Sequence, residues 1–172
     1  MQKKYKYKQK KSPRRSSHRI SDHFSKRDFE CKSGLAQKEF KVSLGLVGAL
    51  ELLKSLTKKR IEIIKGYQCQ KSCENENQIK RNFHALGLAA DIKAQGLDIK
   101  TLLFFAEKIQ EFKGIGINFE KDYLHVDTRK EKKRILWVEK NNKDIMITTE
   151  NKETYLPDIP LQTEITHPEQ PD

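Results

Sequence analysis

The uneven distribution of charge along the 172-residue chain is the feature that most constrains its fold. Residues 1–19 contain nine Lys or Arg and no acid, whereas residues 150–172 contain six acids and one Lys, so the two ends carry charges of +9 and −5. Blocks of like charge repel one another and bury little apolar surface, so they stay unfolded. The pattern predicts a basic disordered tail over residues 1–19, one folded domain over residues 20–149, and an acidic, Pro-containing tail over residues 150–172.

The basic tail has the composition of a segment that attaches to an anionic polymer. Nucleic acid, anionic lipid and bacterial wall polymer all attract such a run of cations. Tyr5 and Tyr7 lie among these cations and could stack on bases. A solubilising tail without a partner is the alternative, and the sequence does not separate the two.

The chain lacks the apolar runs that membrane insertion requires. Hydrophobic residues make up 35% of the composition. No run approaches the ~20 apolar residues of a membrane-spanning helix, and no apolar segment follows the basic N-terminus as in a signal peptide. We therefore expect synthesis in the cytoplasm and no membrane span; the oligomeric state is not encoded in the sequence.

The three cysteines, Cys31, Cys69 and Cys73, are odd in number, which argues against a complete disulfide framework. The CxxxC spacing of Cys69 and Cys73 would suit a metal knuckle or a redox pair. A structural zinc knuckle usually needs a second pair of ligands, and none lies nearby in the sequence. We therefore expect ordinary loop and packing cysteines, and whether Cys69 and Cys73 pair is left open.

Between the tails, the hydrophobic pattern alternates between helical and extended periods. Ser25 and Asp28 have the spacing of a capping box that opens a short helix, and Asp98 is expected to cap a longer helix that Gly114 ends. The expected longer helices cover residues 42–58 and 99–112, and the expected strands cover residues 60–64, 88–92, 115–119, 123–128, 136–140 and 144–148.

Two connections complete this pattern. Residues 67–82 are polar and irregular, which predicts a long loop of the kind that often carries function. Asn141 and Asn142 predict the turn of a last hairpin. Helices grouped together with mostly antiparallel strands predict an α+β fold, a small and mostly antiparallel sheet with helices packed on one side.

His84, Asp91 and His125 are the candidate metal ligands. His84 and Asp91 lie seven residues apart, and Gly87 between them permits a sharp turn. Imidazole and carboxylate form a nitrogen–oxygen donor set that suits zinc. Three protein ligands leave a fourth position for water, which is the pattern of catalytic zinc. Taken singly, each residue has a simpler interpretation as a loop, strand or capping residue.

Two further acids accompany His125. Asp127 shares the strand face of His125 and could orient that ligand through a hydrogen bond. Asp122 lies three residues before His125, at the entrance of the strand, where it could act as the general base of a hydrolytic reaction. As an isolated residue Asp122 is simply a loop acid.

Several ordered motifs surround these residues. They are DHFSKRDFEC from Asp22, IKGYQC from Ile64, HALGLAAD from His84, GIG from Gly114 and HVDTR from His125, followed by Trp137. From about Ser21 to Trp137 their order and spacing resemble the M15-type zinc peptidases, the group of D-Ala-D-Ala carboxypeptidases and peptidoglycan endopeptidases that includes phage endolysins. The HxxGxAxD element followed by HVD is the specific part of the resemblance.

The resemblance implies a role for each of these residues. His84, Asp91 and His125 would be the ligands of a Zn²⁺ ion. Some phage endolysins of the group carry a catalytic aspartate three residues before the last histidine, which matches Asp122. The implied substrate is a peptidoglycan peptide, bound near Tyr67, Gln68 and Asn82.

The chain departs from the family pattern at two of these positions. The family commonly has Ser-Gly-Tyr-Arg where this chain has Lys-Gly-Tyr-Gln, so Gln68 replaces an arginine expected to engage the substrate or the oxyanion. Loss of one such donor can lower the rate by ~10²–10³. Asn82 replaces the serine usually found two residues before the first ligand, but it keeps the ability to hydrogen-bond. Lys80 or Arg81 could supply the missing charge.

These expectations combine into one preferred function and two alternatives. The preferred function is a zinc-dependent metallopeptidase that hydrolyses peptidoglycan stems or cross-links and reaches the cell wall without a signal peptide, as phage lysis enzymes do. A non-catalytic zinc-bound module of the same fold, binding cell wall or another ligand, is the first alternative. The second is a nucleic-acid-associated protein that binds through residues 1–19. The sequence does not identify the peptide bond that is cleaved.

Overall fold

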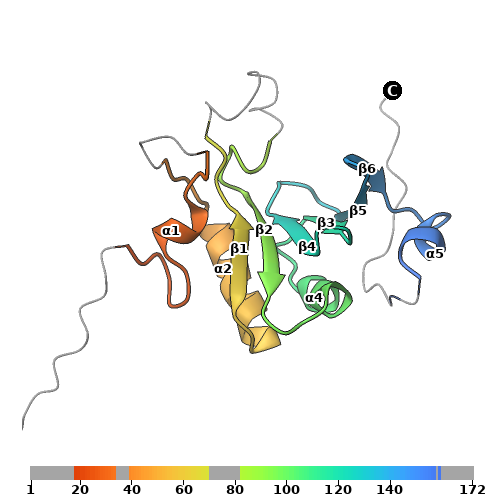
Figure 1. Cartoon of the computed structure of the whole chain (residues 1–172), viewed down its shortest axis with the longest axis horizontal. Coiled ribbons are helices and arrows are strands. Elements are labelled where there is room, and N and C mark those ends of the chain that lie inside the picture. The colour runs from red at the N-terminus through yellow and green to blue at the C-terminus, as the bar shows by residue number, and fades with distance from the viewer. Residues whose placement is uncertain (1–17, 34–38, 70–81, 158, 160–172) are drawn as a thin grey trace, which may run out of the picture.

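The computed structural model describes residues 18–33, 39–69, 82–157 and 159. Six strands form one sheet in the order β1-β2-β4-β3-β5-β6 (Figure 1). The strands are β1 (Ile61–Lys65), β2 (Ala89–Ala94), β3 (Gly114–Asn118), β4 (Tyr123–Asp127), β5 (Ile135–Lys140) and β6 (Lys143–Met146). Neighbouring strands are antiparallel except β3 and β5, which are parallel. The predicted α+β fold with a mostly antiparallel sheet is confirmed.

Four helices accompany the sheet within the described ranges. They are α1 (Lys26–Phe29), α2 (Leu44–Thr57), α4 (Ile99–Ala106) and α5 (Lys152–Tyr155). The predicted capping box opens α1, where the Ser25 N–H donates to Asp28 Oδ2 at 2.7 Å. Asp98 caps α4 as predicted, since its carboxylate accepts from the Thr101 N–H at 2.9 Å. None of these helices is long and apolar enough to cross a bilayer.

The helix predicted over residues 99–112 ends earlier, at Ala106. Beyond it the Ile109 N–H donates to the Ala106 carbonyl and the Phe112 N–H to the Ile109 carbonyl, so tight turns replace helical ones. Gly114 begins β3 and does not terminate the helix. Ile109 and Phe112 are nevertheless buried, which explains why their spacing resembles that of a helix.

One face of the sheet is covered by α2 and α4, which contact each other and the strands β1 to β4. Ile92 of β2 and Leu124 of β4 point to this face and are fully buried in the same core as Leu103 of α4. Because side chains alternate along a strand, their neighbours Asp91 and His125 project from the opposite face. Burial of the apolar strand residues under the helices therefore leaves Asp91 and His125 on the opposite face, where they can form a site.

The packed part of the described chain continues past residue 149, where the predicted domain ends. After α5, Leu156 and Ile159 are buried in the core with exposed fractions of 0% and 4%. The Leu156 N–H donates to the Lys152 carbonyl at 2.7 Å and closes the last helical turn. The acidic tail predicted over residues 150–172 therefore begins with a segment that packs on the domain. Residues 1–17 and 160–172, which make up most of the two predicted tails, lie outside the described residues.

Asn141 and Asn142 form the predicted turn between β5 and β6. Both have positive φ values, 51° and 59°. Two left-handed residues in a two-residue connection match the turn type whose twist fits a hairpin. Lys140 and Lys143 pair across this turn, so the predicted last hairpin is confirmed.

Candidate metal centre

Two of the three predicted metal ligands lie directly opposite each other on neighbouring strands. Asp91 of β2 and His125 of β4 are partners in the antiparallel register, so their side chains project together from the face that the helices leave open. His84 comes from the turn before β2 and completes the group. The ligand atoms of these three residues all lie within 4.8 Å of one another, so the group could hold a metal ion.

The turn over residues 83–87 places His84 against the strands. Asn82 opens this turn, because its Oδ1 accepts from the His84 N–H at 3.0 Å. Gly87 closes it with a φ of 71°, a conformation that a side chain would strain. A Cβ at Gly87 would also lie 2.9 Å from the Lys41 carbonyl oxygen. The sharp turn predicted from Gly87 is thus present.

The three ligand atoms form a small triangle. His84 Nε2 lies 3.1 Å from His125 Nδ1 and 3.2 Å from Asp91 Oδ1, and the last two atoms are 2.9 Å apart. A triangle with these sides has a circumscribed radius of about 1.8 Å, shorter than the ~2.0–2.1 Å bonds of zinc to nitrogen and oxygen. A point outside the plane of the triangle is therefore at bonding distance from all three atoms. The three donor atoms are therefore close enough together to bind one cation.

In each histidine, the ring nitrogen that points away from the triangle is hydrogen-bonded to an oxygen that can only act as an acceptor. His84 Nδ1 donates to the Gly66 carbonyl at 2.7 Å, and His125 Nε2 donates to Asp127 Oδ2 at 3.3 Å. These contacts leave His84 Nε2 and His125 Nδ1 to face each other across the triangle. Two nitrogen lone pairs at 3.1 Å repel each other unless a proton or a cation lies between them. Asp127 lies where the sequence predicts it, behind His125.

The carboxylates of the centre are held in their charged form. Asp127 is fully buried and accepts hydrogen bonds from Arg129, one of them from Nε at 2.8 Å. Burial alone would raise the pKa of Asp127, but hydrogen bonds from Arg129 and His125 lower it to about 2. Burial also opposes ionisation of Asp91, yet its contacts with His125 and His84 hold its pKa well below its ordinary value. Asp91 is therefore an anion at neutral pH, as a ligand for a cation must be.

The two histidines respond differently to their surroundings. Burial lowers the pKa of His84 and outweighs the attraction of Asp91, which keeps this ring neutral. Burial also opposes charge on His125, but hydrogen bonds to Asp127 and Asp91 outweigh it and raise the pKa of His125 to about 9. Without metal, His125 is therefore protonated, and its Nδ1 lies 2.9 Å from Asp91 Oδ1 and 3.1 Å from His84 Nε2. A cation that binds here must displace this proton.

Aromatic side chains surround His125. The ring centroid of Trp137 lies 5.3 Å from that of His125, and the indole packs over Gly116 of β3. A Cβ at Gly116 would come within 2.5 Å of the indole, so glycine is what leaves room for it. The guanidinium of Arg129 lies 4.3 Å from the ring centroid of Phe83 and 5.4 Å from that of Trp137. These contacts restrict Arg129, which in turn holds the carboxylate behind His125.

Asp122, the predicted general base, lies in the turn that leads into β4 and has a positive φ of 54°. Its side chain is 63% exposed and forms an ion pair with Lys93 Nζ at 3.5 Å. Lys93 lies two residues after Asp91 on β2, so the ion pair keeps Asp122 on the ligand face of the sheet. In the described contacts Asp122 touches none of the ligands. A proton can pass between Asp122 and the centre only through a water or a substrate.

The predicted substrate-binding residues lie beside His84. Gln68 Oε1 accepts from Asn82 Nδ2 at 2.8 Å, and the Gln68 N–H donates to the His84 carbonyl at 3.4 Å. Asn82 is hydrogen-bonded at both ends of its amide and thereby supports the turn that carries His84. Tyr67 and Gln68 line a cleft of about 340 Å³ together with Gly66. Lys80 and Arg81 lie outside the described residues.

Two neighbours of the centre, Tyr123 and Arg129, have no role in the sequence-based predictions. Tyr123 Oη donates to Glu139 Oε2 at 2.7 Å, and burial together with this hydrogen bond raises the pKa of Tyr123 above its ordinary value. Tyr123 precedes His125 by two residues, and Arg129 follows Asp127 by two. The alternation of side chains along an extended segment is the signal that could have identified both.

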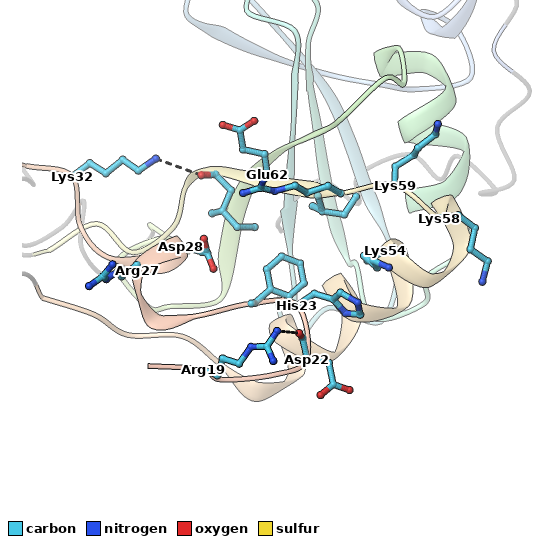
Figure 2. A pocket seen from close by; sticks show the side chains of 14 residues that line it. Arg19, Asp22, His23, Arg27, Asp28, Lys32, Lys54, Lys58, Lys59 and Glu62 are labelled. Carbon is cyan, nitrogen blue, oxygen red and sulfur yellow. Dashed lines mark hydrogen bonds between the residues drawn. The ribbon is translucent and has the colours of Figure 1, made fainter. Parts of the chain in front are cut away.

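A larger cleft, of about 610 Å³, lies between the segment before α1, the end of α2 and β1 (Figure 2). None of the three metal ligands lines it. Its charged lining residues are the cations Arg19, Arg27, Lys32, Lys54, Lys58, Lys59 and Arg60 and the acids Asp22, Asp28 and Glu62. Cations therefore outnumber acids in this lining. The basic tail predicted over residues 1–19 reaches the cleft at Arg19.

Comparison with known proteins finds no relative of this chain. No protein-family model matches the chain, and searches of curated proteins and of solved structures find no similar protein. The interpretation of the site therefore rests on its residues and their geometry. The resemblance to M15-type zinc peptidases stays a prediction.

Proposed function

We propose that the protein is a zinc-dependent peptidase that hydrolyses peptide bonds in peptidoglycan stems or cross-links. The observation that carries this proposal is the convergence of His84, Asp91 and His125 at the open face of the sheet. Structural zinc sites are usually closed by four protein ligands, whereas catalytic sites have three and keep one position for a reactant. The group in the described part of the chain has three.

Zinc suits this donor set better than the other common cations. Two imidazoles and one carboxylate are borderline ligands, whereas calcium and magnesium prefer six or more oxygens. The short sides of the ligand triangle also match a small ion. When bound, zinc would supply Lewis-acid activation of a water and of a peptide carbonyl near neutral pH.

Asp122 is the residue that we assign to proton transfer. Its exposed carboxylate at the ligand face can accept a proton from the attacking water and then donate it to the leaving amine. Lys93 restrains this carboxylate through the ion pair at 3.5 Å. Tyr67 and Gln68 line the cleft next to Gly66 and would hold the peptide. The Gln68 amide would donate a hydrogen bond to the developing oxyanion, in place of the arginine of the family pattern.

Removal and return of zinc test the proposal. Full-length protein is stripped of metal, reconstituted with zinc, and incubated with stem peptides and cross-linked muropeptide dimers. Mass spectrometry of the products should show cleavage that chelation abolishes and zinc restores, and it should identify the bond as D,D, L,D or L-Ala–D-Glu. His125→Ala, which removes a ligand, should lose both zinc and cleavage. Stoichiometric zinc without cleavage of any stem peptide would contradict the catalytic proposal.

Gln68 favours one alternative, a non-catalytic zinc-bound module of the same fold that binds cell wall or another ligand. A neutral amide stabilises an oxyanion less than a guanidinium does. This alternative predicts stoichiometric zinc and retention on insoluble peptidoglycan, with no hydrolysis by the wild type or by Gln68→Arg. Hydrolysis by the wild type would exclude it.

The basic cleft of Figure 2 gives the folded domain, like the predicted basic tail, a surface suited to an anionic partner. We infer that residues 1–19 and this cleft together attach the protein to an anionic wall polymer. Binding should weaken steeply with salt, because each neutralised phosphate releases a counterion. The slope of log affinity against log salt should fall on deletion of residues 1–17 and again with Lys58→Glu. Preferential binding to duplex nucleic acid that deletion of the tail abolishes would support a nucleic-acid-associated protein in its place.

A further inference from the structure

Cys31 and Cys69 come from distant parts of the chain and meet next to Gln68, whose N–H donates to the His84 carbonyl. Cys31 follows α1, and Cys69 lies in the loop that leaves β1. Their sulfurs are 3.1 Å apart although the residues are 38 positions apart in sequence, and both cysteines are in the thiol form. A disulfide bond is about 2.05 Å long, so the sulfurs need to approach by only about 1 Å.

The two thiols differ in their access to solvent. Cys69 is 1% exposed and belongs to the core. Cys31 is half-buried and lines the cleft of about 340 Å³. Ser33, Tyr67 and Gln68 also line this cleft. An external thiol or disulfide can therefore reach Cys31 through the cleft, whereas Cys69 is almost fully buried.

The surroundings of Cys31 also favour its thiolate. The Cys69 N–H donates to Cys31 Sγ at 3.2 Å. Burial opposes ionisation of Cys31, but hydrogen bonds from Ser33 and Cys69 outweigh it and lower the pKa of Cys31 to about 6. The thiolate is the nucleophile in disulfide exchange. An accessible thiolate in contact with a buried second thiol is the arrangement of an attacking and a resolving cysteine.

We propose that Cys31 and Cys69 form a reversible disulfide by exchange with an external disulfide in this cleft. In the first step Cys31 Sγ attacks one sulfur of the external disulfide, the external S–S bond breaks, and one thiolate leaves. In the second step Cys69, as its thiolate, attacks Cys31 Sγ and expels the second external thiolate. The two protein thiols lose two electrons and two protons, and the external disulfide is reduced to two thiols.

The bond would fasten the loop that supports the first metal ligand. This loop carries Gly66, whose carbonyl orients His84, and Gln68, whose N–H donates to the His84 backbone. In the reduced protein the loop is joined to the end of α1 by the hydrogen bond from the Tyr67 N–H to the Phe29 carbonyl at 2.9 Å. A disulfide between Cys31 and Cys69 would add a covalent link two residues further along the loop, and it would also restrict the unfolded chain. The proposal involves no peptide hydrolysis, so it stands or fails separately from the proposed activity.

The test uses the full-length protein, fully reduced and then equilibrated with glutathione disulfide. Thiol titration should show three reactive thiols per denatured chain before oxidation and one afterwards, since the chain has three cysteines. The intact mass should fall by about 2 Da with no glutathione adduct, and peptide mapping should place the bond between Cys31 and Cys69. The melting temperature should rise by roughly 5–15 °C and return on reduction.

Two variants test whether Cys31 is part of the disulfide. Cys31→Ser should prevent the loss of mass and the rise in melting temperature, whereas Cys73→Ser, the matched control, should leave both unchanged. Mapping of the wild type decides the question even if Cys31→Ser folds poorly. A bond between Cys69 and Cys73, a stable glutathione adduct on Cys31, or a second bound zinc that blocks oxidation would each overturn the proposal.

Discussion

Replacement of Asp127 by asparagine tests whether this carboxylate holds the metal centre in place. Asp127→Asn preserves the size of the side chain but removes its charge. In the wild type the fully buried carboxylate accepts from His125 at one oxygen and from Arg129 at both. An asparagine presents an NH₂ group to one of these donors, so at least one hydrogen bond is replaced by a donor–donor contact.

The structure gives the expected size of the effects of Asp127→Asn on stability and on zinc affinity. A pKa of about 2 for Asp127 corresponds to about 2 kcal/mol of stabilisation at neutral pH. Loss of one partner from a buried ion pair costs about 3–5 kcal/mol. We therefore expect the free energy of unfolding at pH 7 to fall by about 2–5 kcal/mol. Loss of a carboxylate that orients a ligand histidine typically weakens metal binding 10–100-fold, so the dissociation constant for zinc should rise by roughly that factor.

Two measurements separate these effects. Urea unfolding of the metal-free protein, followed by the fluorescence of Trp137, the only tryptophan, gives the stability. Competition with a chromophoric chelator gives the zinc affinity. Glu120→Gln is the matched control, because it removes a charge from an exposed turn residue and should change neither quantity by more than about 0.5 kcal/mol.

The outcome distinguishes two roles of the carboxylate. Zinc affinity within twofold of the wild type would refute the claim that Asp127 orients His125. Reduced stability combined with unchanged affinity would limit the role of Asp127 to its ion pair with Arg129. Wild-type values for both quantities would refute the whole account of the pair.

Four further predictions concern the proposed base, the pH dependence of stability, the sheet and helix α2. Asp122→Asn should lower the hydrolysis rate by ~10²–10⁴-fold while zinc content, measured on the same sample, stays at the wild-type level. The raised pKa of His125 stabilises the metal-free protein fully below pH 6.5, and this stabilisation, up to about 3 kcal/mol, is lost as the pH rises through 9; urea unfolding at pH 7 and pH 9.5 in chelator measures it. Gly116→Ala should destabilise the fold by about 1–3 kcal/mol, because its Cβ would overlap the Trp137 ring. Gly48→Ala in α2, where no atom lies within 4 Å of the new Cβ, should be neutral or stabilising by up to ~1 kcal/mol, and urea unfolding measures both glycine variants.

The parts of the site that local sequence patterns determine were predictable. The spacing of His84 and Asp91 around Gly87 predicts a turn followed by a strand, and the structure has both. Alternation along β4 places His125 and Asp127 on one face, away from the helices. The pairing of Asp91 with His125 follows once these strands are adjacent, because one register puts the apolar side chains of both in the core.

The parts that depend on distant packing were not predictable. Ile109 and Phe112 have helical spacing, but they reach the core through tight turns after α4 has ended. Ile159 belongs to a Pro-containing acidic segment, and composition gives no sign that it is buried. The contact between Cys31 and Cys69 spans 38 residues, so it depends on how the segment after α1 meets the loop after β1. No local pattern encodes such an encounter.

The metal ligands come from distant parts of the chain, and this separation sets the order of events during folding. His84 and His125 are 41 residues apart, and Asp91 meets His125 only after β2 and β4 have paired. Such long-range pairings form slowly, because the intervening chain must first lose its freedom. The ligand triangle is therefore complete only once β2 and β4 have paired. We therefore expect an ion that binds only the completed triangle to stabilise the native state, and so to slow unfolding more than it changes the folding rate.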